Sequence, residues 1–114
     1  MSTAASHEPM LRLLRMLPHE PRARMVAMYC DTLVTQLAEL GQALEGSDQD
    51  AATALAHKLA GSAAMMQDAA LAQPARAVEQ ALRADCLIEA LRLWPLLRSH
   101  AARTLDVLRA YPAA

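Results

Sequence analysis

The sequence predicts an all-α protein, specifically an antiparallel up-down four-helix bundle with a short extra N-terminal helix. Ala and Leu dominate the composition, and only three of the 114 residues are glycine. This composition favours helices over strands. Apolar residues recur every three or four positions along most of the chain, which is the period of an amphipathic helix. The length predicts a single domain, residues 1–114.

Prolines separate a short N-terminal segment from the bundle. Residues 1–8 are expected to form a flexible tail and residues 9–17 a short helix laid across one end. Pro18 and Pro21 close off that helix. The bundle is expected over residues 21–110. The start at Met1 and the few residues after this range are typical of a stand-alone protein.

The second and third helices are expected to meet at a very short junction. Pro21 suits the first turn of the second helix, and Gly46 is expected to supply its left-handed C-terminal cap. Ser47 is expected to cap the third helix, over about residues 48–66. The apolar stripe of the second helix comprises Val26, Cys30, Leu33, Leu37, Leu40 and Leu44.

The fourth and fifth helices are interrupted by prolines. Asp68 opens a connector or the fourth helix, which either begins regularly at Pro74 or is kinked there. Asp85 is expected to cap the fifth helix, over about residues 86–110, and Pro95 to bend it. The inner positions are expected to be Leu71, Ala75, Val78 and Leu82 in the fourth helix, and Leu87, Leu91, Trp94, Leu97, Ala101, Leu105 and Leu108 in the fifth.

Composition excludes several classes of function. A net charge of −1 argues against nucleic-acid binding, which needs a basic surface. No apolar run approaches the ~20 residues of a membrane span, and the first residues do not resemble a signal peptide, so a cytoplasmic protein is expected. Cys30 and Cys86 are expected to be unpaired. No metal-ligand spacing joins the cysteines and histidines.

His57 lies on the outward side of the third helix. At about 100° per residue, Leu55, Leu59, Ser62 and Met66 form the inner face, and His57 points away from them. Gly61 beside it costs about 1 kcal/mol relative to Ala in a helix interior. One interpretation is an ordinary surface histidine with a packing glycine. The other is an imidazole left clear for a partner, on a docking face comprising Thr53, Ala54, Ala60, Ala64 and Asp68.

The motif around His57 favours the second interpretation. The segment Ala56-His57-Lys58-Leu59-Ala60-Gly61-Ser62 resembles the active-site helix of histidine-phosphotransfer domains, whose pattern is His-x-Leu-Lys-Gly-Ser/Ala. Val78-Glu79 resembles a Leu-Glu pair in the family's next helix. The resemblance in helix order and lengths extends over roughly residues 21–110. It implies that His57 accepts a phosphoryl group on Nε2.

The resemblance also implies roles for neighbouring residues. Glu79 matches the position that orients the imidazole, although an ordinary solvated carboxylate is an equal alternative. Arg83 either offsets phosphoryl charge or pairs with Glu79. The family's lysine three residues after the histidine is Ala60 here. Lys58 is the nearest lysine and projects about 100° to the side of His57.

The implied function is that of a phosphocarrier in a two-component phosphorelay, and not of an enzyme, because the sequence has no ATP-binding motif. The expected partners are receiver domains of response regulators or hybrid histidine kinases, which supply the aspartate and Mg²⁺. The chain needs no cofactor of its own and is expected to be a monomer. The alternative is a helical adaptor that binds a receiver or kinase domain without accepting phosphate. A helical enzyme is a third candidate, but no catalytic set supports it.

Overall fold

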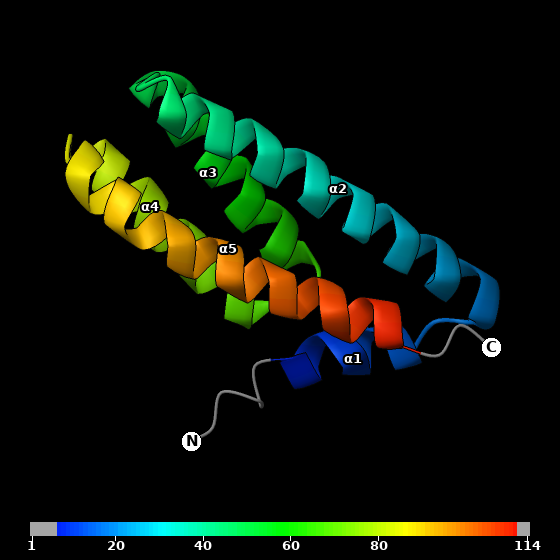
Figure 1. The fold of residues 1–114 in the computed structure, drawn as a ribbon. Coiled ribbons are helices and arrows are strands. Elements are labelled where there is room, and N and C mark those ends of the chain that lie inside the picture. Colours follow the sequence, from blue (N-terminus) through cyan, green and yellow to red (C-terminus); the bar gives the residue numbers. More distant parts are fainter. Residues whose placement is uncertain (1–6, 112–114) are drawn as a thin grey trace.

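The computed structural model describes residues 7–111, which form five helices and no strand (Figure 1). This confirms the all-α class. None of the described helices is both long and apolar enough to span a membrane. The helices are α1 (Glu8–Arg15), α2 (His19–Glu45), α3 (Gln49–Met65), α4 (Ala69–Arg83) and α5 (Leu87–Ala110).

The N-terminal boundaries differ slightly from the predicted ones. The tail predicted over residues 1–8 falls mainly on residues 1–6, which lie outside the described part, and Glu8 is already the first residue of α1. The second helix begins at His19, ahead of Pro21, because Pro18 at its N-cap has an extended backbone that suits a helix start. In α4, Pro74 lies inside the helix, so the alternative of a regular start there is wrong.

One type of turn joins α2 to α3, α3 to α4 and α4 to α5. In each turn a residue other than glycine is left-handed: Ser47 (φ 55°), Gln67 (φ 59°) and Asp85 (φ 60°). In each, the next backbone N–H donates a hydrogen bond of 2.9 Å to a carbonyl five residues earlier. These bonds complete a Schellman motif, which satisfies carbonyls at the helix end.

These turns correct three cap predictions. Gly46 is not left-handed (φ −83°), because the left-handed position falls one residue later, on Ser47. The N-cap of α3 is therefore Asp48, whose side chain accepts a hydrogen bond from the Ala51 N–H. Likewise Cys86, and not Asp85, is the N-cap of α5, because Asp85 takes the left-handed position.

The core forms where the apolar stripes of the helices meet. All four inner residues predicted for α4 are buried. In α5, Leu97, Ala101, Leu105 and Leu108 are buried as predicted, but Leu91 is 44% exposed and Ala90 is buried in its place. The phase of α5 near its start therefore differs by one residue from the predicted stripe.

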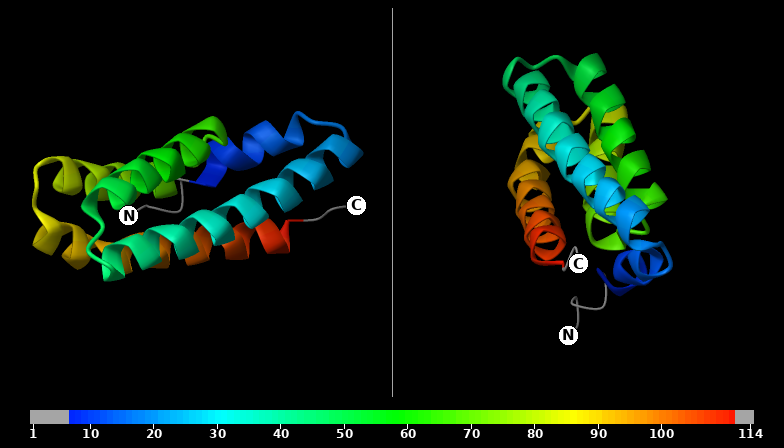
Figure 2. Two further views of the ribbon diagram at one scale, coloured as in Figure 1. Left: turned by 90° about the horizontal axis from the view of Figure 1, so that it is seen from above. Right: turned by 90° about the vertical axis from the view of Figure 1, so that its right-hand side faces the viewer.

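The first helix, α1, closes one end of the bundle. Figures 1 and 2 show it lying across the end where α2 begins and α5 ends. Its Met10 and Leu14 are completely buried. The Arg22 side chain of α2 donates hydrogen bonds to the carbonyls of Leu14 and Leu17, at 3.0 and 2.8 Å. Apolar burial and these carbonyl contacts thus hold α1 against α2.

A buried polar cluster surrounds Asp68, which is completely buried. Its Oδ2 accepts hydrogen bonds from the hydroxyls of Tyr29 (2.8 Å) and Thr104 (3.0 Å). The prediction that Asp68 belongs to an outward docking face is therefore wrong. The helical phase of α3 ends at Met65, and the left-handed Gln67 turns the chain so that Asp68 points inward.

We expect Tyr29→Phe to lower the free energy of unfolding by about 1–3 kcal/mol, the cost of leaving a buried polar group short of a partner. Burial, together with Asp68, raises the pKa of Tyr29, so its hydroxyl stays protonated and donates. Urea unfolding measures the change, with Tyr111→Phe at the end of α5 as the control. Equal stability of Tyr29→Phe and the native chain would contradict this account of the cluster.

Candidate functional site

The structure places His57 on the surface of α3, with 71% of its side chain exposed. Its Nδ1 lies 2.9 Å from Oε2 of Glu79 on the neighbouring α4. One ring nitrogen is therefore held by a carboxylate. This agrees with the outward orientation expected from the helical period, and it brings together two residues that the sequence singled out.

Glu79 is the centre of the polar contacts at this site. Its side chain is only 12% exposed, and the guanidinium of Arg83 contacts its Oε2 at 2.9 Å through Nε and at 2.8 Å through a terminal nitrogen. Burial pushes the pKa of Glu79 upward, but the hydrogen bonds from Arg83 and His57 outweigh burial and hold the pKa below its usual value. Glu79 is therefore an ionised carboxylate at neutral pH.

An ionised carboxylate fixes the tautomer of His57. A carboxylate accepts hydrogen bonds and cannot donate them, so the Nδ1 that contacts Glu79 must carry the proton. In a neutral imidazole the other nitrogen, Nε2, then holds the lone pair. The exposed ring thus presents a nucleophilic nitrogen away from Glu79.

A hollow of about 340 Å³ lies beside the ring, between α3 and α4. One cation that lines it, Arg76, was not identified from the sequence. The spacing of positions 76, 79, 80 and 83 could have indicated Arg76, because these four residues share one face of a helix. The sequence does not show, however, how α4 is rotated against α3, and this rotation places that face beside His57. The residues lining the hollow are His57, Ala60, Gly61, Arg76, Glu79, Gln80 and Arg83.

Gly61 and Gly41 show two different reasons for a glycine inside a helix. A Cβ on Gly41 would lie 3.1 Å from Cζ2 of Trp94, so the glycine admits the indole of α5. A Cβ on Gly61 would meet nothing within 4 Å. Internal packing therefore does not require Gly61, and its position in the hollow beside His57 leaves space for another molecule.

The remaining predicted docking residues divide into exposed and covered positions. Ala54 and Ala64 are exposed, and Thr53 is partly exposed. Ala60 is only 4% exposed, so its prediction as a surface docking residue is wrong. It lies on the side of α3 that α4 covers and forms part of the hollow's wall. Lys58 is exposed but does not line the hollow.

Comparison with known proteins identifies the family. The family model of the Hpt domain matches residues 24–110. The chain belongs to the Hpt domain family. No curated protein and no solved structure matches it significantly. The Hpt match contains α3, α4 and every residue of the hollow, so the site described above lies wholly within the family's domain.

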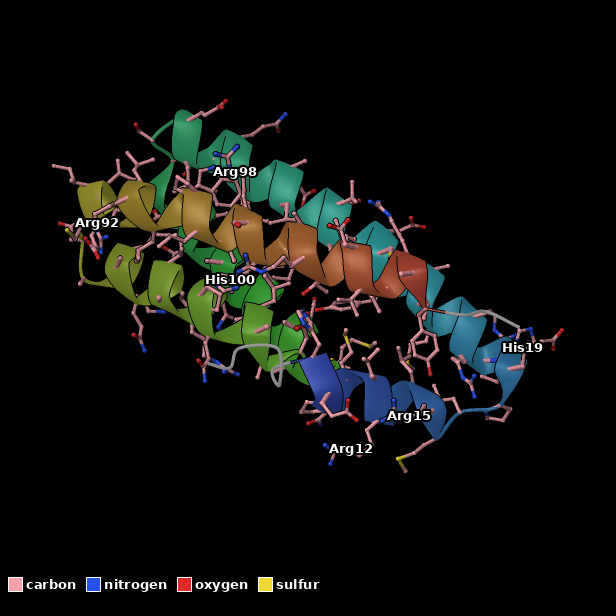
Figure 3. All side chains as sticks on the ribbon, turned by 60° about the horizontal axis from the view of Figure 1, so that its bottom comes forward. Arg12, Arg15, His19, Arg92, Arg98 and His100 are labelled. Atoms are coloured by element: carbon pink, nitrogen blue, oxygen red, sulfur yellow. The ribbon has the colours of Figure 1, made fainter. Side chains whose placement is uncertain are left out.

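The other histidines of this Hpt domain do not form a second site of the same kind. His19 lies at the start of α2 and His100 on α5 (Figure 3), and neither of them lines the hollow beside His57. Nδ1 of the partly buried His100 lies 2.9 Å from a terminal nitrogen of Arg103, and burial lowers the pKa of His100. His7 contacts the Thr104 hydroxyl at 3.4 Å. Within residues 7–111 no group of three potential ligands could hold a metal ion.

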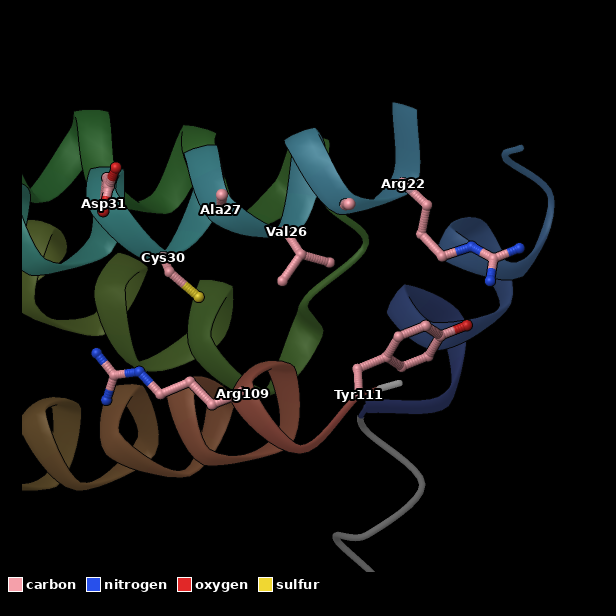
Figure 4. Close-up of a pocket in the computed structure, with 8 residues that line it drawn as sticks. Arg22, Val26, Ala27, Cys30, Asp31, Arg109 and Tyr111 are labelled. Carbon is pink, nitrogen blue, oxygen red and sulfur yellow. The ribbon is translucent and has the colours of Figure 1, made fainter. Parts of the chain in front are cut away.

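A second hollow, of about 330 Å³, lies between α2 and the end of α5 (Figure 4). Its only thiol is that of Cys30. Burial raises the pKa of this thiol, against a smaller opposing effect of Arg109, so it stays protonated and is a weak nucleophile. The hollow has neither the exposed imidazole nor the carboxylate of the His57 site. It is lined by Arg22, Ala23, Val26, Ala27, Cys30, Asp31, Arg109 and Tyr111.

Proposed function

We propose that this Hpt domain is a cytoplasmic, monomeric phosphocarrier of a two-component phosphorelay. His57 accepts a phosphoryl group from an aspartate of one receiver domain and donates it to an aspartate of another. The observation that carries the proposal is the exposed His57 ring with Nδ1 bound to the ionised Glu79. In this proposal α2 to α5 form an antiparallel up-down bundle that presents the ring to the partner.

The transfer step follows from the tautomer. The Nε2 lone pair attacks phosphorus, the bond between phosphorus and the aspartyl oxygen breaks, and the aspartate leaves as a carboxylate. No proton has to move, because Nδ1 already carries one. The imidazole becomes a cation when Nε2 is phosphorylated, and the negative charge of Glu79 stabilises that cation through the hydrogen bond. Donation to the next receiver reverses the step.

The chain contributes positioning to this reaction, and the partner contributes the remaining groups. In phosphoryl transfer most of the catalysis comes from alignment and charge stabilisation. A receiver domain would bring the aspartate and Mg²⁺, so the Hpt domain needs no metal and no ATP site of its own. We therefore propose a phospho-intermediate without enzymatic turnover.

Glu79→Ala should slow phosphorylation of His57 by about tenfold, within the range that one positioned hydrogen bond contributes. The alanine leaves Nδ1 without an acceptor, so the ring loses its fixed tautomer and the counter-charge of the phosphorylated state. Glu79→Gln keeps a hydrogen-bond acceptor without the charge, so its rate of phosphorylation should lie between those of the native chain and Glu79→Ala. Initial rates of labelling by one phosphorylated receiver measure the effect. Equal rates in all three proteins would show that Glu79 is only a surface carboxylate.

An assay against the receivers of the same genome tests the proposed function directly. Each receiver is phosphorylated and mixed with the Hpt domain, and transfer is followed by gel. A cognate receiver should label the Hpt domain with a phosphate that is labile in acid and stable in alkali. Failure of every receiver to label it would overturn the proposal.

The second candidate is a helical adaptor that binds a receiver or kinase domain without accepting phosphate. Two observations favour it. Alanine stands at position 60, where the family usually has lysine, and Lys58 does not line the hollow. This candidate predicts receiver binding that is unchanged by His57→Gln and no labelling in any condition. The labelling assay therefore separates the two functions.

A further inference from the structure

The charges in the hollow beside His57 do not cancel. Arg76, Glu79 and Arg83 all line it. Glu79 and Arg83 form an ion pair at 2.8 Å, so their opposite charges offset each other. Arg76 makes no ion pair with any residue that the structure describes between 7 and 111. One uncommitted positive charge therefore remains beside the imidazole.

A phosphoryl group on His57, which lines this hollow, would bring about two negative charges at neutral pH. A guanidinium suits such a group, because its N–H donors can bind two phosphate oxygens at once. Arg83 is poorly placed for this role, since its Nε and a terminal nitrogen already contact Glu79. Lys58 lies outside the hollow. Arg76 is the remaining cation on the hollow's wall.

We propose that Arg76 binds the phosphoryl group carried by His57, so that α4 supplies both the acceptor for Nδ1 and the cation for the phosphate. The inference rests on the proposed function and adds a phosphoryl-binding residue to it. Arg83 has a separate part as a positioning residue, because it holds Glu79 against the ring. The site then has one arginine for the carboxylate and another for the phosphate.

The direct test uses phosphoramidate, a small donor that needs no protein partner. Nε2 of His57 forms a bond to phosphorus, the phosphorus–nitrogen bond of phosphoramidate breaks, and ammonia leaves with the proton it requires from water. The full chain is compared with Arg76→Gln, which keeps much of the stem and removes the charge, and with Arg76→Lys. Arg24 is an exposed arginine on α2 that lies outside the hollow. Its replacement in Arg24→Ala is the matched control for loss of one positive charge.

Two readouts distinguish phosphate binding from a structural effect. Arg76→Gln should label about three- to tenfold more slowly, between the effect of an exposed ion pair and that of a charge-assisted hydrogen bond. The phosphorus NMR shift follows the titration of the phosphoryl group on His57. The pH midpoint of this titration should rise in Arg76→Gln, because the doubly charged phosphoryl group loses the cation that stabilises it. Arg76→Lys should recover part of both effects, and Arg24→Ala should behave as the native chain does.

The outcomes separate this inference from the function on which it rests. A native rate and a native midpoint in Arg76→Gln would overturn the assignment of Arg76 and leave the phosphocarrier intact. Equal slowing by Arg24→Ala would show a general charge effect and would also overturn it. Failure of the native chain to form phosphohistidine would overturn both the phosphocarrier function and the role of Arg76, since Arg76 would have no phosphoryl group to bind.

Discussion

The His57→Gln variant is expected to lose all of the acid-labile phosphate that a phosphorylated receiver transfers to the native chain. Glutamine has no nucleophilic ring nitrogen, and the other described histidines lie outside the hollow. The side chain of His57 is 71% exposed, so its replacement should leave the fold intact. Circular dichroism and urea unfolding check the fold, and labelling in the presence of the receiver checks the function.

His19→Gln is the matched control, because His19 is also exposed on a helix but lies outside the hollow. It should accept phosphate at the native rate. Labelling of His57→Gln at that rate would show that another residue carries the phosphate, and the site built around α3 and α4 would then be wrong.

The Gly61→Leu variant is expected to be more stable than the native chain and yet a poorer phosphate acceptor from a receiver. A Cβ at this position meets nothing within 4 Å, so the gain in helix propensity, about 0.8–1 kcal/mol, should appear in the free energy of unfolding. The leucine side chain would fill space beside His57, where we propose that the receiver docks. We expect transfer from the receiver to fall at least tenfold, about 1.4 kcal/mol.

Two comparisons make this prediction specific. Ala38→Leu adds a similar side chain at an exposed position of α2, in a different hollow that Trp94 also lines, and it should leave transfer unchanged. Gly61→Ala should gain most of the stability and lose less transfer, because a methyl group is small. Native transfer rates in Gly61→Leu would mean that the open space at Gly61 is not part of the docking surface.

Much of the fold follows from the spacing of apolar residues. Each helix buries one apolar stripe, and this stripe sets both the length of the helix and the face that it turns toward the core. Leu71, Ala75, Val78 and Leu82 illustrate this, since all four were expected inside and are buried. The turns were harder to predict. Glycine usually takes the left-handed position, but here Ser47 does, one residue after Gly46. That single shift moved the expected cap from Ser47 to Asp48.

The site was predictable within helices and less predictable between them. The period of α3 placed His57 outward, and the resemblance to the family pointed to Glu79 on α4. Asp68 and Ala60 were misplaced because their exposure depends on where α3 ends and on which side α4 covers. Arg76 was missed for the same reason, since its position beside His57 depends on the packing of α4 against α3 and not on any motif.

The identity of the reacting nitrogen is the most direct test of the central claim. Glu79 holds Nδ1 at 2.9 Å, so only Nε2 is free to accept phosphorus. Nitrogen NMR of the isotope-labelled, phosphorylated protein identifies the nitrogen that couples to phosphorus. The account predicts coupling at Nε2 of His57 with the proton retained on Nδ1. Coupling at Nδ1, or at a histidine other than His57, would contradict it.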